Sequence, residues 1–237
     1  MSNISLYLSI VIVIGITLSY LIDDLVVISK GFGGLYKINA LASNLGSSIF
    51  LFSRAIMALI LPILGFLIDS GVSIKIMLII VTGFTFLMSL LKIVMYYNIN
   101  RLILFLSWVT KKVYGADKIT VSNDNFLNLT YKREVNLQSI LAMALFISGM
   151  TIPSLMAIFF FDNRAFFIQI GFVFNMIGTL LTVLFIERKI AMDAEKVAIG
   201  KIDQNSFITS ISSVILSRAV GAFICTLVSV SVLMAIY

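Results

Sequence analysis

Long uninterrupted apolar runs dominate the chain, and short polar stretches separate them. These runs are long enough to cross a bilayer as α-helices, which takes roughly 20 residues, and they lack the apolar–polar alternation of transmembrane barrel strands. The pattern predicts an all-α, polytopic membrane helix bundle that forms a single transmembrane domain over residues 1–237. Six transmembrane helices are expected, at residues 4–28, 38–68, 74–97, 138–161, 165–186 and 208–236.

Proline and glycine positions refine this expectation. The second span is longer than a bilayer requires, so it must tilt, kink at Pro62 or extend into water. Pro153 is expected to interrupt the fourth span. The glycine-rich segment that begins at Lys30 follows no strand, so a flexible turn is expected there rather than a phosphate-binding loop.

The basic residues are distributed unevenly between the connections. Twelve lie in the first, third and fifth connections, and two lie in the second and fourth. The positive-inside rule then places the odd-numbered connections in the cytoplasm and both termini outside. The net charge is +6, and most of the basic residues lie between the spans, next to the membrane surface. Anionic membrane lipids are therefore expected as partners, and nucleic acid is not.

The third connection, residues 98–137, is expected to contain two parts. Its first part is apolar, with Trp108 and two terminal lysines, Lys111 and Lys112. That pattern predicts an interfacial helix along the cytoplasmic membrane surface. Residues 115–136 are polar and are expected to form a small exposed hairpin or loop.

Composition excludes several classes of chemistry. The chain is 60% hydrophobic and 12% charged, with no histidine and with Cys225 as its single cysteine. An intrachain disulfide is therefore impossible, and zinc sites, haem sites and imidazole-based catalysis lose their usual groups. We expect no catalytic residues, no metal site, no cofactor and no enzyme activity.

The chain also contains an internal similarity at an offset of 164 residues. Residues 37–60 and 201–224 share 8 of 24 positions, among them a lysine at the start and a Ser-Arg-Ala sequence. This similarity predicts a parallel internal repeat, whose halves would be related by an axis along the membrane normal. The repeat pairs Arg54 with Arg218, Ser53 with Ser217, and Asp23 with Glu187.

Two arginines fall well inside predicted spans. Arg54 lies about sixteen residues into its span and Arg218 about ten residues into its own. An arginine near the bilayer centre costs about 2.5–3.5 kcal/mol on insertion scales, so it needs a polar cavity or a partner. Lys92, in contrast, lies near the end of its span and is expected to extend to the interface.

Carboxylates and hydroxyls are available to both arginines. Asp23, Asp24 and Glu187 are candidate counter-charges, and Ser53 and Ser217 precede the two arginines. Two interpretations stay open: structural ion pairs within the bundle, or an anion site in which guanidinium and hydroxyl groups bind phosphate or diphosphate.

The fifth and last spans carry further polar side chains. Gln169 and Asn175 are expected to form interhelical hydrogen bonds or to line a pore. A face of small residues in the last span, which includes Cys225, packs against a helix or lines a cavity.

Two segments of the sequence resemble a known family. The first runs from Ile22-Asp23-Asp24 through Ser53-Arg54 and Leu61-Pro62-Ile63-Leu64-Gly65 to Ile68-Asp69, and the second runs from Lys189-Ile190-Ala191 through Gly200-Lys201 to Ser217-Arg218-Ala219-Val220-Gly221. These segments are similar to the two ends of the Amj family, bacterial lipid II flippases that act as an alternate to MurJ. Residues 98–160 show little of this resemblance.

The resemblance implies a flippase of the inner membrane. It would move an undecaprenyl-diphosphate-linked sugar, a lipid-linked oligosaccharide, from the cytoplasmic to the outer leaflet for peptidoglycan synthesis. Arg54 and Arg218 would bind the diphosphate, and the three carboxylates would hold the guanidinium groups when the site is empty. Partners would include a second copy of the chain or envelope synthases.

Three alternatives stay open. Apolar Ile56, Met57 and Ile224 stand where family members tend to carry amides, so the substrate could be a lipid-linked O-antigen or capsule unit. The chain could also be a non-transporting scaffold for envelope synthases, or an enzyme that acts on the same carrier lipid.

Overall fold

The structure, a computed structural model, describes residues 3–114 and 136–236, and within these ranges every regular element is a helix. The prediction of an all-α fold is confirmed. The elements are α1 (Asn3–Tyr36), α2 (Asn39–Asp69), α3 (Ile74–Tyr97), α4 (Ile99–Tyr114), α6 (Leu137–Phe159), η1 (Phe161–Asn163), α7 (Arg164–Leu181), η2 (Thr182–Glu187), α8 (Arg188–Ala198) and α9 (Gln204–Ala235).

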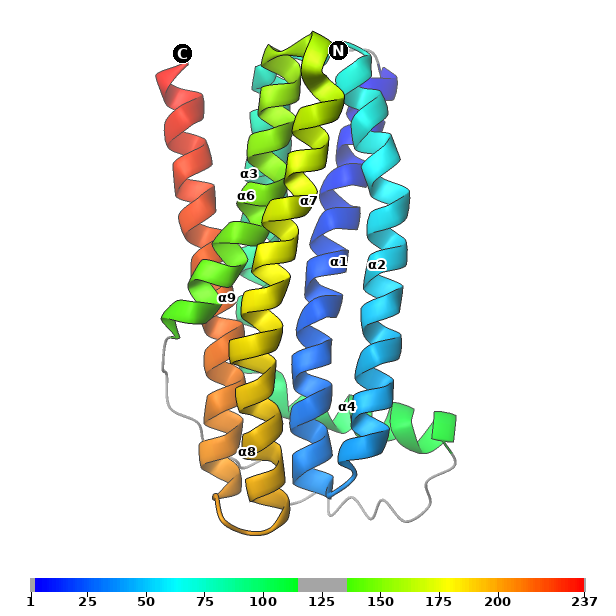
Figure 1. The fold of residues 1–237 in the computed structure, drawn as a ribbon, viewed down its shortest axis with the longest axis vertical. Coiled ribbons are helices and arrows are strands. Elements are labelled where there is room, and N and C mark those ends of the chain that lie inside the picture. Colours follow the sequence, from blue (N-terminus) through cyan, green and yellow to red (C-terminus); the bar gives the residue numbers. More distant parts are fainter. Residues whose placement is uncertain (1–2, 115–135, 237) are drawn as a thin grey trace.

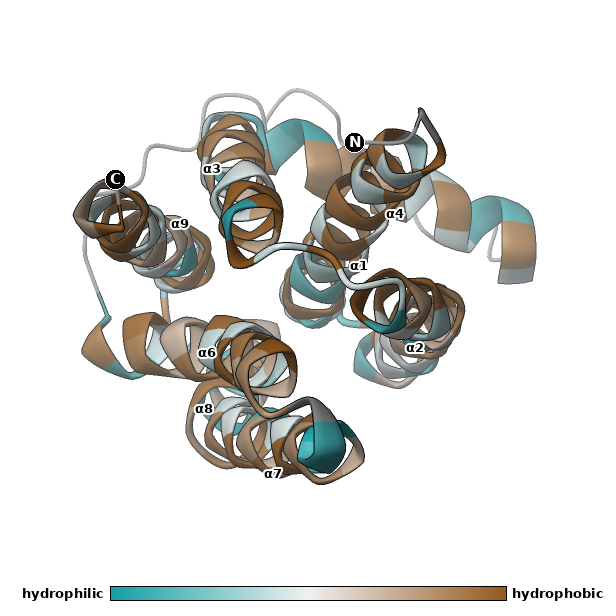
Figure 2. Cartoon of the chain, turned by 90° about the horizontal axis from the view of Figure 1, so that it is seen from above, coloured by the Kyte–Doolittle hydropathy of each residue, from teal (hydrophilic) through white to brown (hydrophobic). Residues whose placement is uncertain are grey.

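The long helices stand side by side in one bundle (Figure 1). Among the described residues, six helical segments are long and apolar enough to cross a membrane. The surface between the ends of these helices is rich in exposed Leu, Ile, Val and Phe side chains. Seen from above, α6, α7 and α8 lie opposite α1, α2 and α3 (Figure 2). Both termini lie at one end, here called the termini end, and the opposite end is called the α4 end.

The first helix is longer than its apolar run. It continues to Tyr36 and includes the glycine-rich segment from Lys30, so the expectation of a flexible turn there is wrong. The helix persists because its last turns are packed: Phe32 is fully buried, and a Cβ on Gly34 would lie 2.7 Å from the Cα of Ala194 in α8. The glycines of this segment permit close helix contact.

The fourth predicted span is also continuous. Helix α6 runs through Pro153 without a break, so the expected interruption is wrong. A proline leaves the carbonyl four residues earlier without its helical donor, and that carbonyl belongs to Gly149. Helix α7 packs closely at this point, since a Cβ on Gly171 would lie 2.6 Å from the Gly149 oxygen.

The last part of the chain is more helical than its hydropathy predicts. The fifth span continues through the π-helical segment η2 into α8, so that residues 188–198, expected to be a connection, are helical. Helix α9 begins at Gln204 rather than at residue 208, because Asp203 caps it by accepting a hydrogen bond of 3.0 Å from the Asn205 N–H.

Two turns at the α4 end have the same form. Lys37 after α1 and Gly200 after α8 both adopt a left-handed conformation, with φ of 59° and 76°. In each turn the following N–H reaches back five residues to a helix carbonyl, as in a Schellman motif. The turns lie 163 residues apart, close to the 164-residue offset of the predicted repeat, which stays a prediction.

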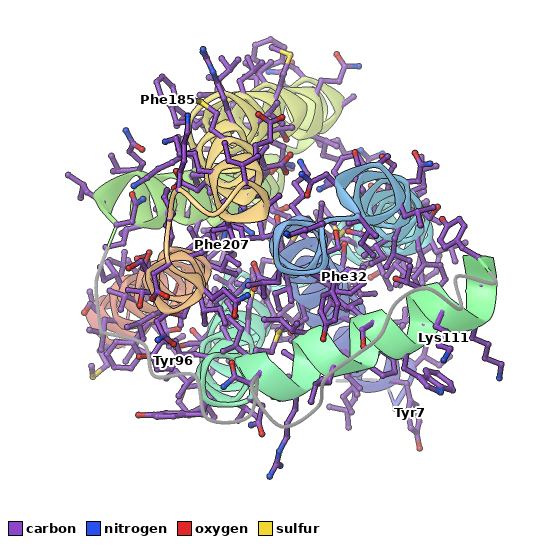
Figure 3. All side chains as sticks on the ribbon, turned by 90° about the horizontal axis from the view of Figure 1, so that it is seen from below. Tyr7, Phe32, Tyr96, Lys111, Phe185 and Phe207 are labelled. Carbon is purple, nitrogen blue, oxygen red and sulfur yellow. The ribbon has the colours of Figure 1, made fainter. Side chains whose placement is uncertain are left out.

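Helix α4 lies across its end of the bundle (Figure 3). Ile103, Leu106 and Thr110 are buried against the bundle, whereas Trp108 is 57% exposed. This arrangement is typical of a helix at a membrane interface. The predicted polar hairpin or loop at 115–136 lies almost entirely outside the described residues.

The apolar interior is divided into two cores. One core, at the α4 end, is centred on Phe32, Phe207 and Ile211. The other, toward the termini end, contains Ile16, Phe84 and several methionines. Helices α1, α2, α3 and α9 contribute to both cores, and on each of these four helices charged residues lie between the two.

Glycine positions allow a test of this packing. Gly34→Ala should destabilise the bundle by about 1–3 kcal/mol, because the new methyl group meets the α8 backbone and overpacks the contact. Thermal unfolding of the purified protein in detergent measures the effect. Gly65→Ala is the matched control: no atom lies within 4 Å of its added Cβ, so its stability should be unchanged or raised by up to about 1 kcal/mol. Equal stability of the two variants would contradict the packing.

Candidate functional site: an ionic layer between two cores

Charged side chains from five helical elements gather between the two apolar cores. We call this set the ionic layer; it consists of Asp23, Asp24, Lys30, Arg54, Lys92, Glu187 and Arg218. Arg54 occupies the middle of α2, fifteen residues from either end. Lys92 lies five residues before the end of α3, about 8 Å along the helix axis from the start of α4.

Asp24 is the centre of the layer. Its carboxylate is fully buried and binds two cations, Lys92 of α3 and Arg218 of α9. The Arg218 Nη1 atom lies 2.7 Å from Asp24 Oδ1, and the side chains of Lys92 and Arg218 are 1% and 6% exposed. The ammonium group of Lys92 also donates to the Tyr20 carbonyl. One carboxylate thus connects three helices.

Asp23 points to the other side of α1 and binds Arg54 of α2. The Nη2 atom of Arg54 donates to Asp23 Oδ2 at 2.7 Å, and the guanidinium group lies over the Phe50 ring at 4.6 Å from its centroid. Successive residues on a helix point about 100° apart, which is why adjacent aspartates serve different helices. The Arg54 side chain is 36% exposed, so this pair lies at the edge of the bundle.

Glu187 completes the layer from η2. Glu187 is expected from the sequence to be a counter-charge for an arginine, but in the structure it pairs with Lys30 of α1 instead. The two predicted arginine–carboxylate pairs are therefore formed by Asp23 and Asp24. Glu187 still lies beside the arginines, because it lines the same pocket.

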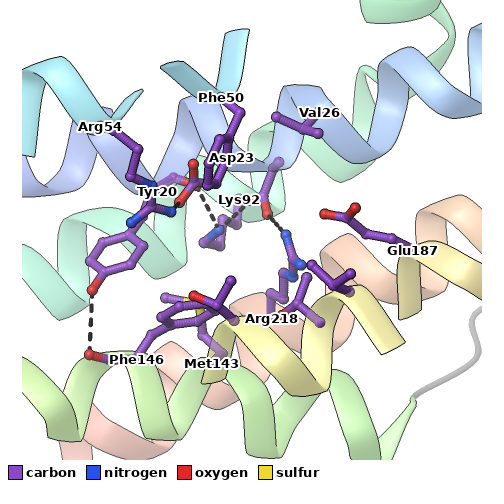
Figure 4. A pocket seen from close by; sticks show the side chains of 14 residues that line it. Tyr20, Asp23, Val26, Phe50, Arg54, Lys92, Met143, Phe146, Glu187 and Arg218 are labelled. Atoms are coloured by element: carbon purple, nitrogen blue, oxygen red, sulfur yellow. Dashed lines mark hydrogen bonds and ion pairs between the residues drawn. The ribbon is translucent and has the colours of Figure 1, made fainter. Parts of the chain in front are cut away.

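Both arginines reach one pocket (Figure 4). The pocket encloses about 40 Å³, which is room for a few water molecules, since one water needs roughly 10–15 Å³. It opens sideways between α2 and η2, where Phe50 and Val183 are exposed. Its lining consists of Tyr20, Asp23, Asp24, Val26, Phe50, Arg54, Lys92, Met143, Phe146, Thr179, Thr182, Val183, Glu187 and Arg218.

The pocket has unmet hydrogen-bonding capacity. The Nε–H of Arg54, the Oδ1 atom of Asp23 and the hydroxyl of Thr182 are buried without a partner. Buried polar atoms of this kind normally have partners, so each one needs a water or a ligand. At their formal charges, the four cations and three carboxylates of the layer also leave one positive charge in excess.

The two repeated serines are engaged elsewhere. Ser53 and Ser19 exchange hydrogen bonds between α2 and α1, with their hydroxyl oxygens 2.9 Å apart. Ser217 donates to the Ser213 carbonyl and accepts a 2.6 Å bond from the Asn136 N–H. Neither hydroxyl lines the pocket. The structure therefore brings together five of the seven predicted site residues and leaves Ser53 and Ser217 as helix-packing contacts.

Sequence analysis missed part of this site. The expectation that Lys92 extends to the membrane interface is wrong, because the side chain is buried on Asp24. Lys30 and Thr182 were not singled out as site residues. Thr182 lies in a π-helical segment, and such segments are frequent at functional sites, but the apolar sequence of that stretch carries no signal of it.

Comparisons of the chain with protein-family models, with curated proteins and with solved structures gave no match.

The shared carboxylate leads to a test of the layer. Asp24→Asn should destabilise the bundle by about 3–5 kcal/mol, because it leaves two buried cations without a counter-charge. Lys92→Met should be much milder, since Asp24 keeps Arg218. Thermal unfolding in detergent measures both effects.

The double variant separates pairing from packing. Asp24→Asn combined with Lys92→Met removes one of the two unpaired cations, so it should be more stable than Asp24→Asn alone. Simple additivity of the two single effects would show that Lys92 and Asp24 do not interact.

Proposed function

We propose that this protein is a flippase that carries a polyprenyl-diphosphate-linked sugar across the bacterial inner membrane. One observation carries the proposal: Arg54 and Arg218, from helices far apart in the sequence, line one pocket that opens sideways from the bundle. A lipid with a charged headgroup needs this combination, because its headgroup must enter the protein while most of its hydrocarbon chain stays in lipid.

The charges of the pocket favour an anionic headgroup. The layer has one positive charge in excess, and the Arg54 Nε–H and Thr182 hydroxyl have no partner. A diphosphate supplies several acceptor oxygens and at least two negative charges, and guanidinium groups bind such oxygens in a bidentate way. The headgroup would replace hydration that it cannot keep in hydrocarbon.

The structure corresponds to a closed state in this proposal. A pocket of about 40 Å³ has no room for a diphosphate, so α2 and η2 must separate before the headgroup enters. The ligand would then take the place of Asp23 on Arg54 and of Asp24 on Arg218. Asp24 keeps Lys92 during this exchange, and Asp23, whose side chain is 16% exposed, lies closer to the surface of the bundle than Asp24.

The membrane potential provides a driving force. A charge that crosses the full field gains about 2.3 kcal/mol per 100 mV, so a dianion that leaves a negative interior gains roughly 5 kcal/mol per 100 mV. With the α4 end in the cytoplasm, as the basic residues predict, outward movement is downhill. The lipid-linked sugar of peptidoglycan synthesis is the substrate we favour, and an O-antigen or capsule unit has the same diphosphate.

A structural role is the second candidate, and one observation favours it: both arginines already have carboxylate partners. In that case the layer would fix the register of the helices in a scaffold protein. The two candidates differ in what happens when the arginines are replaced by neutral side chains.

Arginine replacement tests the proposal. Arg54→Gln and Arg218→Gln should each lower transport by about 10- to 100-fold, the loss expected when a charged hydrogen bond of 1.5–3 kcal/mol to the headgroup is removed. The measurement is outer-leaflet accessibility of the lipid-linked sugar in vesicles that contain this chain alone. Unchanged transport in the double variant would contradict an anion site.

Arg164→Gln is the matched control for this experiment. Arg164 pairs with Asp69 at the termini end, at 2.9 Å, far along the helices from the ionic layer. Its replacement removes an arginine and an ion pair but should leave transport unchanged. Arg54→Lys, which keeps the charge and loses the bidentate geometry, should transport at an intermediate rate.

A further inference from the structure

Three cavities lie along one seam of the bundle. Helix α2 forms one side of the seam, and the continuous run of α7, η2 and α8 forms most of the other. From the α4 end to the termini end, α2 contributes Asn39 and Ser43 to the first cavity, Phe50 and Arg54 to the second, and residues 61–68 to the third. The ionic pocket is the middle one.

The cavity at the α4 end is the most polar. It measures about 210 Å³, and Lys30, Asn39, Ser43 and Glu195 contribute hydrogen-bonding groups to it. Lys30 pairs with Glu187, which lines the ionic pocket, so this ion pair stands between the two cavities. Alanines of α8 form the remaining wall.

The cavity toward the termini end is apolar. It measures about 100 Å³ and lies between α2 and the α6–α7 pair. Its walls consist mainly of Leu, Ile, Met, Pro and Gly residues. For comparison, an engineered cavity of about 150 Å³ with apolar walls stays dry and binds benzene. Gly65 faces open space in this region, since nothing lies within 4 Å of its Cβ position.

The apolar cavity and the ionic pocket are neighbours. Asn175 lines the first and Thr179, one helical turn away, lines the second. The buried Oδ1 atom of Asn175 has no partner, so a polar atom marks the junction. The remainder of the apolar cavity extends along α2 from Leu61 to Ile68, over about 10 Å.

We propose that the apolar cavity binds the first part of an isoprenoid chain whose diphosphate occupies the ionic pocket. The proposal rests on the proposed function and deepens it. The seam presents polar, charged and apolar surfaces in the order in which sugar, diphosphate and isoprenoid follow one another in a polyprenyl-linked sugar. A headgroup bound from the α4 side directs its chain toward the termini end, where Gly65 leaves space.

Two soluble probes separate the chain from its headgroup. Purified wild-type protein in detergent should bind farnesyl diphosphate about tenfold more tightly than inorganic diphosphate, the gain expected from burying about two methylene groups. Gly65→Phe should fill the apolar cavity and abolish this preference, while binding of inorganic diphosphate stays unchanged. Calorimetry gives both affinities, and Gly65→Leu provides a second, smaller filling in case the first variant does not fold.

Leu59→Phe is the control for added bulk on α2. Leu59 is 71% exposed on the bundle surface, so its replacement should leave the preference for farnesyl diphosphate intact. The same variant also corrects the measured affinities for partition of the probe into detergent. A preference that survives both Gly65 substitutions would overturn the chain site and leave the anion site standing. Failure of both probes to bind the wild-type protein would overturn both proposals.

Discussion

A fully buried carboxylate that binds two buried cations is the constraint on which this bundle depends. Asp24 ties α1 to α3 through Lys92 and to α9 through Arg218, midway between two apolar cores. Buried ion pairs are seldom the most stable solution, because well-packed apolar residues often replace them without loss. In a membrane, where hydrocarbon surrounds the protein, a layer of seven charged residues is costly, and the ligand site proposed above would account for it.

The packing around the layer suits a protein that changes shape. Helix α2 packs along α1, and α7 packs along α6, whereas the seam between these two pairs contains the cavities. Met57, Met88, Met143 and Met150 lie in the core on the termini side of the layer. Methionine is flexible and tolerates repacking, so this core can adjust if α2 moves relative to α7 and η2.

Hydropathy and charge position were sufficient to predict the bundle and the pairing of Arg54 and Arg218 with carboxylates inside it, because both signals are local in sequence. Burial of Lys92 was not predictable, since a lysine near the end of a span normally reaches the interface, and its pairing with Asp24 depends on how α3 packs against α1. The predicted helix boundaries were wrong for the same reason. The glycine-rich end of α1 and the polar helix α8 are helical because they pack against each other, which neither segment shows alone.

Lys92 resolves an apparent conflict between the ion pairs of the arginines and the phosphate binding proposed for them. If Arg218 were the only partner of Asp24, turning Arg218 toward a phosphate would leave a bare carboxylate in the core, at a cost of several kcal/mol. Because Lys92 holds the same carboxylate, Arg218 can exchange partners while Asp24 stays neutralised. Arg54 has no such second cation beside it, and its partner Asp23 is less deeply buried, with 16% of its side chain exposed against 0% for Asp24. The asymmetry between the two arginines thus follows from the depth at which each one is buried.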